Sequence, residues 1–205
     1  MEPIKKIEGR IAPLDRSDVD TDQIIPAVWL KRVERTGFGE GLFSAWRESD
    51  PNFVLNKPEF EGTRVLVAGP NFGTGSSREH AVWALMDYGF QAVISPKFGD
   101  IFRNNATKAG LVPVQVDDAF GAELMEAALE HPFLEVVVDV ETRTVLVPRL
   151  GMQTTFPLDE FTQHRLLNGL DDIGITLQHA DEVEAYEAQR KPWLPKVDHP
   201  EAKVS

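Results

Sequence analysis

The sequence predicts an α/β domain with a mixed, largely parallel β-sheet flanked by helices. Between residues 64 and 116, three apolar segments of strand character alternate with two segments of helical periodicity. The predicted strands are 64–69, 92–96 and 112–116, and the predicted helices are 76–89 and 98–110. This β-α-β-α-β order favours parallel strands, and Gly89 and Gly110 mark the ends of the two helices.

The residues that follow add antiparallel strands and further helices. Two β-rich segments, 134–140 and 144–148, predict a hairpin because only three residues separate them. Helices are predicted at 118–131, at 159–169 with Asp159 as a possible N-cap, and at 180–190, where the sequence is acidic and the helix exposed. Residues 1–190 are predicted to form a single domain, and residues 191–205 an extended or disordered tail.

The first 63 residues have weaker periodicity. Residues 9–15 and 22–30 are predicted as short strands, and the proline in each restricts it to an edge or an end of the sheet. Residues 31–56 mix charge, glycine and aromatic side chains, so we expect mostly loop with a short helical piece at 42–46. We also expect this 31–56 region to be a substrate loop that is mobile without a partner.

Composition narrows the functional classes. The 205 residues, 42% hydrophobic and 26% charged, are typical of one globular domain. We expect a cytoplasmic protein without a membrane partner, because neither a secretory signal nor a stretch of roughly 20 apolar residues is present. A net charge of −12 argues against nucleic acid as a partner. The absence of cysteine excludes disulfides, thiol catalysis and cysteine-held iron–sulfur clusters within the chain.

A glycine-rich turn between a predicted strand and the next helix is the strongest functional signal. Gly69, Gly73 and Gly75 allow positive φ angles and close approach of the backbone to a ligand, and a helix start presents N–H groups that attract anions. We predict that the backbone of Gly73, Thr74 and Gly75 stabilises negative charge. Arg78 favours a carboxylate, which guanidinium binds through two parallel N–H bonds. Phosphate is the alternative, although the turn lacks the Walker and dinucleotide-binding patterns.

A helix cap is the simpler explanation of this turn. Ser76 or Ser77 would cap the helix that follows, and Glu79 lies three residues after Ser76, as a capping box requires. A cap explains one serine but not the glycines and Arg78 around it, so we favour a binding or catalytic loop. His80 lacks a second ligand at metal-binding spacing, and we expect it to serve packing.

Three motifs in the same order resemble the small-subunit family of 3-isopropylmalate dehydratases in the aconitase superfamily. They are DVDTDQIIPAVWLKR at 18–32, GTGSSREHA at 73–81 and FGDIFRNNATKAGLVPV at 98–114, and the resemblance covers roughly residues 5 to 190. It implies an aconitase-type swivelling β/β/α domain that docks, as a separate polypeptide, on a large subunit that holds a [4Fe–4S] cluster. It also implies that this chain binds no metal or cofactor itself, which agrees with its lack of cysteine.

The resemblance implies a reaction and the residues that perform it. A small dicarboxylate, 2-isopropylmalate, is dehydrated to an alkene and rehydrated to 3-isopropylmalate in leucine biosynthesis. Ser76 takes the carbon-bound proton, Ser77 lies beside it, and Arg78 holds a substrate carboxylate. A serine hydroxyl is a poor base unless its alkoxide is stabilised, and the amides of the turn and the helix dipole would supply that stabilisation.

The motif at 18–32 contributes further candidates. Asp20 and Asp22 alternate in a segment predicted as extended, so both side chains would project to one side; simple turn residues are the alternative. The resemblance places Asp22 at the edge of the active site, where it orients an arginine or a serine. It also implies a second substrate-binding arginine, for which we favour Arg35 over Arg32, and residues 33–38 as the segment that recognises the isopropyl group.

Two other functions fit parts of the sequence. The small subunit of a homoaconitase or of a methylated-malate (citraconate-type) hydratase would share the serine–arginine turn, but the length of residues 31–41 favours the isopropylmalate type. A non-catalytic anion-binding or regulatory module would tolerate replacement of Ser76 and Arg78, and both are present. We therefore predict the small subunit of a heteromeric hydro-lyase that is active only with its large subunit.

Overall fold

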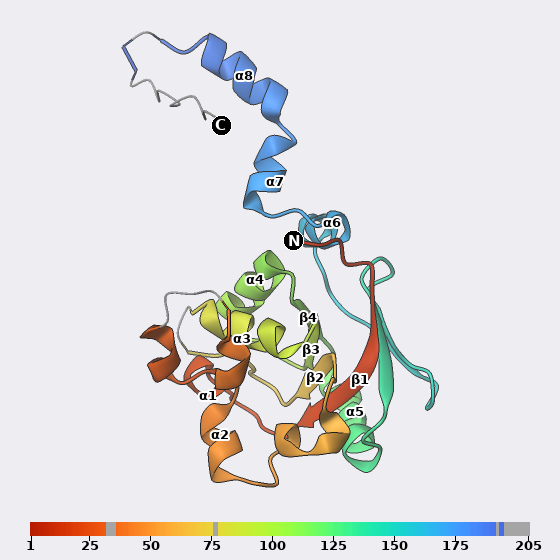
Figure 1. The fold of residues 1–205 in the computed structure, drawn as a ribbon. Helices are drawn as coiled ribbons and strands as arrows, with labels where there is room; N and C mark the ends of the chain where they lie inside the picture. Colours follow the sequence, from red (N-terminus) through yellow and green to blue (C-terminus); the bar gives the residue numbers. More distant parts are fainter. Residues whose placement is uncertain (32–35, 76–77, 192, 195–205) are drawn as a thin grey trace, which may run out of the picture. The chain divides into compact units, whose positions relative to one another are not determined.

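A computed structural model describes residues 1–31, 36–75, 78–191 and 193–194 (Figure 1). Contacts divide the chain into two compact units, Met1–Asp171 and Asp172–Ser205, which we describe separately. The first unit contains the sheet and the hydrophobic core. The single domain of residues 1–190 and the tail of residues 191–205 remain predictions.

A seven-stranded sheet in the order β4-β3-β2-β1-β5-β6-β7 organises the first unit. Its strands are β1 (Lys6–Leu14), β2 (Val65–Ala68), β3 (Ala92–Ser95), β4 (Val112–Gln115), β5 (Glu135–Asp139), β6 (Thr144–Val147) and β7 (Met152–Thr155). Strands β1 to β4 pair in parallel, whereas β5, β6 and β7 pair antiparallel with their neighbours. The predicted mixed sheet and the predicted hairpin are confirmed.

Strand β1 joins the two halves of this sheet. Its residues 6–10 pair antiparallel with β5 and its residues 11–14 pair in parallel with β2. Figure 1 shows β1, in red, between the parallel strands and the blue-green antiparallel strands. The predicted strand 9–15 is thus confirmed, but it is central in the sheet. Pro13 is tolerated because it is the last residue but one, where a missing N–H disturbs little of the ladder.

Helix α5 (Asp118–Glu130) lies against one face of the sheet. Its Phe120, Leu124 and Met125 pack with residues of β1 to β4 such as Ile11 and Ile94 in one buried cluster. Strands β5 and β6 add alternate residues to the same cluster, as expected for strands that have one face in water. This side of the sheet therefore needs only one crossover helix.

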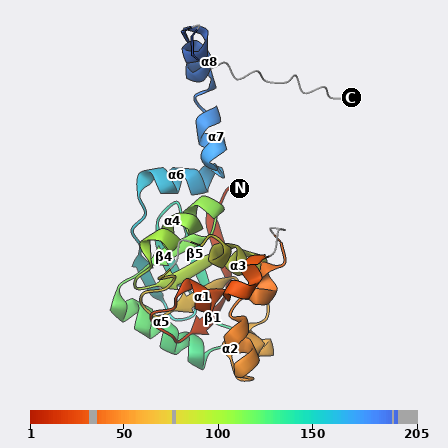
Figure 2. The same ribbon diagram turned by 90° about the vertical axis from the view of Figure 1, so that its left-hand side faces the viewer.

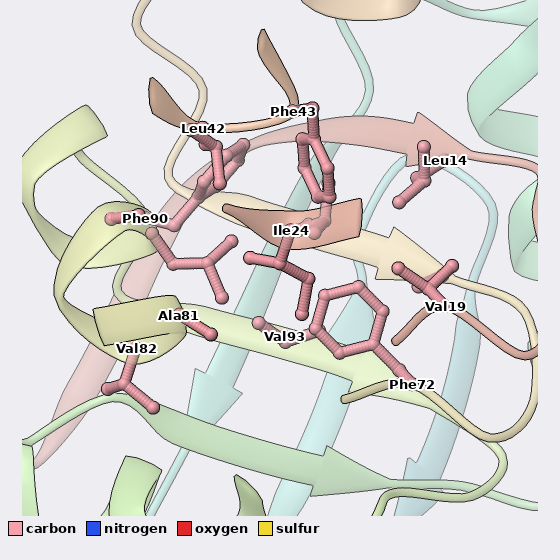
Figure 3. Packing of buried hydrophobic residues seen from close by; sticks show 14 of the residues in the cluster. Leu14, Val19, Ile24, Leu42, Phe43, Phe72, Ala81, Val82, Phe90 and Val93 are labelled. Atoms are coloured by element: carbon pink, nitrogen blue, oxygen red, sulfur yellow. The ribbon is translucent and has the colours of Figure 1, made fainter. Parts of the chain in front are cut away.

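Helices α3 (His80–Tyr88) and α4 (Asp100–Ala109) belong to the cluster on the opposite face, together with the segment between β1 and β2. Figure 2 shows α5 and α2 on opposite sides of the strands. In Figure 3, Phe43, Ile24 and Phe72 point into this second cluster, and the side chains of Phe43 and Ile24 are fully buried. The segment before β2 thus supplies a large part of the core.

The predicted strand 22–30 is wrong. These residues form α1 (Thr21–Ile24) and a 3-10 helix, η1 (Ala27–Lys31). Asp20 caps α1 through a hydrogen bond from the Gln23 backbone, and the Gln23 side chain accepts one from the backbone N–H of Asp20. This reciprocal capping box provides a helix start that the apolar run does not reveal.

Short helices also replace much of the loop expected at 31–56. They are η2 (Phe38–Gly41), α2 (Ser44–Ser49) and η3 (Val54–Asn56), and a further 3-10 helix, η4 (Pro58–Phe60), follows shortly after the region. Each contributes or adjoins a buried side chain, including Phe38, Phe43, Leu55 and Phe60. The expected helical piece at 42–46 corresponds to the start of α2, while the mobility of the region stays a prediction.

The predicted helix ends agree best where glycine marks them. Gly89 and Gly110 follow α3 and α4 with φ angles of 119° and 98°, values that suit glycine. Helix α6 (Glu160–Asn168) begins as predicted after Asp159, whose side chain accepts a hydrogen bond from the backbone of Thr162 at 2.9 Å. Helix α3 starts later than predicted, at His80.

The second unit contains α7 (Asp172–Leu177) and α8 (Ala180–Ala188). Helix α8 matches the predicted acidic helix, whereas α7 was not predicted. Neither helix has a buried residue. Within the part of the chain that the structure describes, no helix is long and apolar enough to span a bilayer.

Candidate active site

Three loops meet where β1, β2 and β3 end. Parallel strands bring their carboxyl ends to one edge of a sheet, which is where ligands of open α/β folds commonly bind. An isolated bridge joins Asp20 in the first loop to Thr74 in the second, and another joins Phe72 in the second loop to Phe98 in the third. The predicted glycine-rich turn is the second loop, so it lies between the other two.

Backbone hydrogen bonds hold the first and second loops together. The Val19 carbonyl accepts from the N–H groups of Gly73, at 2.7 Å, and Thr74, at 3.2 Å, and the Thr74 carbonyl accepts from Thr21 at 2.9 Å. Val19 and Phe72 anchor the two loops in the core, where Figure 3 shows them pointing inward. These bonds already engage the N–H groups of Gly73 and Thr74, so they are not free to hold an anion in this conformation. The stabilisation of negative charge by the backbone of Gly73, Thr74 and Gly75 therefore stays a prediction.

Two glycines of the turn, Gly69 and Gly73, are required for close packing with neighbouring segments. Gly73 has φ 75°, and a Cβ atom there would overlap the ring of Phe102. Gly75 has φ 93° and is exposed. Gly69 does not have a positive φ; a Cβ atom there would lie 2.6 Å from the carbonyl oxygen of Arg16. The expected positive φ is thus confirmed at two of the three positions.

Arg78 and Asp22 form an ion pair across the site. The Arg78 Nη1 atom donates to the Asp22 Oδ1 atom, and the two side chains are 28% and 56% exposed. Asp22 lies in the first turn of α1, while Asp20 is engaged in the cap of that helix. The prediction that the two aspartates project together from an extended strand is therefore wrong, because the segment turns into a helix between them.

His80 packs against aromatic rings. Its ring centroid lies 5.4 Å from that of Phe38 and 4.8 Å from that of Trp83. The expected packing role is confirmed. Among the described residues, no group of three or more His, Cys, Asp or Glu side chains is arranged to hold a metal ion.

Comparison with known proteins identifies the family. Residues 1–119 match the family "Aconitase C-terminal domain", and residues 172–199 match the family of C-terminal domains of the 3-isopropylmalate dehydratase small subunit. The 3-isopropylmalate dehydratase small subunit of Rubrobacter xylanophilus is 57% identical over 197 residues, covering 96% of this chain and all of that protein. The chain belongs to the family of 3-isopropylmalate dehydratase small subunits.

Other members of the family agree. The 3-isopropylmalate dehydratase small subunit of Acidothermus cellulolyticus is 58% identical over 195 residues, covering 95% of this chain and 98% of that one. A crystal structure of 3-isopropylmalate dehydratase from Methanocaldococcus jannaschii is 26% identical, with a TM-score of 0.64, and covers 89% of this chain and 99% of that chain. The predicted fold class and the predicted role as small subunit of the heteromeric isomerase of leucine biosynthesis are confirmed.

Four site residues predicted for this 3-isopropylmalate dehydratase small subunit lie outside the described residues. They are Ser76, Ser77, Arg32 and Arg35. Their proposed roles therefore remain predictions. The alternative explanation of the turn, a capping box of Ser76 with Glu79, does not describe the start of α3, because the N-cap is Glu79 and it makes no side-chain cap hydrogen bond.

Sequence reasoning about this small subunit missed two contacts in the site. Asn71 donates from Nδ2 to Oδ1 of Asp18 at 2.7 Å, and both residues have positive φ angles. The buried Ser95 donates from Oγ to the carbonyl oxygens of Gly69, at 2.8 Å, and Lys97, at 2.9 Å. Asp and Asn in loops are a weak signal for left-handed backbone, whereas Ser95 gives no signal inside an apolar strand.

Proposed function

We propose that residues 73–78 form the part of the active site that this subunit provides, with Ser76 as the base and Arg78 as the anchor of a substrate carboxylate. The ion pair of Arg78 with Asp22 carries this proposal. It places a guanidinium beside the glycine-rich turn in a chain whose net charge is −12. A dianionic substrate needs such a local positive group, since the overall field of the chain repels it.

The chemistry sets clear demands on this turn. A proton leaves the carbon next to a carboxylate, hydroxide leaves the neighbouring carbon, and water then adds to the alkene with the opposite orientation. As its alkoxide, Ser76 would accept the proton at Oγ, become a neutral hydroxyl, and return the proton during rehydration. Arg78 would hold the carboxylate next to the carbon that loses the proton and neutralise charge that builds on it.

Asp22 would orient Arg78 in this scheme. The guanidinium has five N–H donors, so one nitrogen can stay on Asp22 while the others bind substrate. The pair is partly exposed, so it adds little to folding stability. Its main effect would be to fix the orientation of the Arg78 side chain. We assign Asp22 an orienting role, without contact to the reacting atoms.

The cluster is proposed for the partner subunit. This chain has no cysteine, so it does not fit a [4Fe–4S] cluster held by thiolates. On the partner, such a cluster would supply Lewis acidity toward the leaving hydroxyl group. Docking of the two subunits would then complete the site, and we propose the cytoplasm as the place where this biosynthetic enzyme works.

The segment that selects the substrate is proposed within residues 33–38. Phe38 is 1% exposed and packs on His80 and Trp83, so it anchors this segment in the core. Arg35 is favoured over Arg32 as the second carboxylate ligand. An apolar pocket discriminates by only about 1–3 kcal/mol per methylene, so close relatives of isopropylmalate would also react.

Reconstitution with the large subunit tests the proposal. Ser76→Ala should abolish measurable turnover with 2-isopropylmalate while the mutant still co-elutes with the large subunit. Unchanged turnover would refute the role of Ser76 and favour a non-catalytic anion-binding module. Assaying the wild-type assembly with 2-isopropylmalate, homocitrate-type and methylated-malate substrates would separate the isopropylmalate enzyme from a homoaconitase or a citraconate-type hydratase.

A further inference from the structure

Two non-glycine residues with left-handed backbone face each other beside the proposed active turn. Asp18, in the loop after β1, has φ 55°, and Asn71, in the loop after β2, has φ 61°. This conformation is unfavourable for residues that carry a Cβ atom, and Asn and Asp tolerate it best. Two adjacent loops therefore carry the same backbone strain at the same place.

Side chains and backbone both join these residues. The Asn71 Nδ2 atom donates to Asp18 Oδ1 at 2.7 Å, and the Asp18 N–H donates to the carbonyl oxygen of Pro70 at 2.9 Å. Asp18 is exposed and Asn71 is half-buried. A hydrogen bond at such a surface contributes little to stability, whereas the buried Val19 and Phe72 already anchor both loops.

Asp18 and Asn71 precede, in their own loops, the two residues of the ion pair between Asp22 and Arg78. The chain runs from Asp18 through Val19 into the α1 turn with Asp22, and from Asn71 through the glycine-rich turn to Arg78. The contact between Asp18 and Asn71 thus joins the two segments that lead to the charged side chains, in addition to the backbone hydrogen bonds of Val19. Strained residues of this kind are found where a site must be held in one geometry.

We propose that the Asp18/Asn71 pair is a positioning device that fixes the distance between the Asp22 loop and the Arg78 turn. Neither residue contacts substrate in this proposal; both act through Arg78 and the turn. The inference rests on the proposed function of residues 73–78. It requires that the pair be needed for turnover but not for folding or for assembly with the large subunit.

A charge-swap series in the reconstituted enzyme tests this role. Asn71→Asp places two carboxylates in contact, which repel each other. Because misplacement by about 1 Å can cost on the order of a hundredfold in rate, we expect kcat/KM to fall about tenfold or more. The double variant Asp18→Asn with Asn71→Asp restores an amide–carboxylate bond of reversed direction, and we expect it to recover most of the lost activity. Such recovery is not expected if the two positions act independently.

Two further variants keep the test decisive. Asn71→Gly keeps the left-handed backbone but removes the hydrogen bond, so its activity should fall without a loss of thermal stability. Asp139→Asn changes a carboxylate at the end of β5, one that accepts a hydrogen bond from the Thr142 backbone, and should leave activity unchanged. Thermal unfolding and co-elution with the large subunit are measured for every variant.

Specific outcomes would overturn the proposal. Full activity of both Asn71→Asp and Asn71→Gly would do so. A loss of activity that the double variant Asp18→Asn with Asn71→Asp does not recover would also overturn it, as would a loss of activity that accompanies a loss of thermal stability. Ser76→Ala, measured in parallel, distinguishes failure of the positioning role from failure of the proposed function. If Ser76→Ala is inactive and the Asn71 variants are active, only the positioning role fails; if Ser76→Ala is fully active, the proposed function of the turn fails first.

Discussion

The guanidinium of Arg78 lies on the carboxylate of Asp22, although 56 residues separate them in the sequence. Arg78 precedes α3, and Asp22 lies in the first turn of α1. The ion pair therefore connects the segments that follow two neighbouring parallel strands, β1 and β2. The sheet brings these loops together, and backbone hydrogen bonds through Val19 hold them in place.

Removing the carboxylate of Asp22 should reduce turnover more than it reduces folding stability. Asp22→Ala leaves Arg78 without its orienting partner, and we expect kcat/KM of the reconstituted enzyme to fall about tenfold to a hundredfold. The free energy of unfolding should change by about 1 kcal/mol or less, because exposed pairs contribute little. Glu8→Gln, which breaks the exposed pair with Lys6, is the matched control and should keep full activity.

Replacing Arg78 by lysine tests whether bidentate binding of the substrate carboxylate is needed. Arg78→Lys keeps the charge but loses the planar fork, so a charged hydrogen bond worth about 2–3 kcal/mol is lost and kcat/KM should fall on the order of a hundredfold. Steady-state kinetics across substrate concentrations provide the measurement. A lysine variant with wild-type kcat/KM would show that charge alone suffices.

The glycine at position 73 should be needed for folding. In Gly73→Ala, the positive φ costs about 1 kcal/mol and the overlap with Phe102 adds about 1–3 kcal/mol. Gly151 also has a positive φ, of 65°, but its Cβ position is open. Urea unfolding should therefore show a larger loss for Gly73→Ala than for Gly151→Ala, and equal losses would contradict the packing described here.

The cap of α6 should make stability depend on acid pH. Hydrogen bonds from the backbone and then the side chain of Thr162 lower the pKa of Asp159. A lowered pKa means that the carboxylate stabilises the fold above its ordinary value of about 3.9, and that this contribution is lost as pH falls through the lower value.

Two variants at Asp159 separate the charge from the cap. Asp159→Ala should lose about 1 kcal/mol at neutral pH, and its difference from wild type should shrink below about pH 4. Asp159→Asn caps without titrating and should remain close to wild type at neutral pH. Unfolding free energies from pH 7 to pH 3 give the comparison, and a pH-independent difference for Asp159→Ala would contradict it.

Removal of the second unit should leave the first one folded. Helices α7 and α8 have no buried residue, while residues 1–171 contain both core clusters. A chain ending at Asp171 should melt within about 4 °C of the full chain, a difference that corresponds to about 1 kcal/mol. A much larger loss would support the predicted boundary at residue 190.

The parts of the fold that sequence predicts well have local signals. Strands β2 and β3 are short apolar runs, and the helices after them end at glycines with positive φ. Segment 22–30 misled because Ile24 and Ile25 look like a strand, while the decisive Asp20 and Gln23 cap is a pair of polar contacts three residues apart. Strand β7 has one apolar residue, Met152, and three polar ones, so its sequence gives little strand signal; it pairs with the edge of β6.

The candidate site shows the same division. The glycines and Arg78 stand out in the sequence because no ordinary helix start needs them together. Among the neighbours of that turn, Asp22 is expected there only from the family resemblance. Asp18 and Ser95 do not stand out in the sequence, because they come from another loop and strand that the sheet brings close. Long-range pairing is thus what sequence reasoning on a single chain could not supply.

The central place of β1 affects how this protein must be made. Strand β1 pairs with residues 65–68 on one side and residues 135–139 on the other. Until residues 135–139 have been synthesised, one edge of β1 has no partner, and its apolar side chains stay open to contact with other nascent chains. Cells that produce this protein in quantity would therefore depend on chaperones during translation more than its modest size suggests.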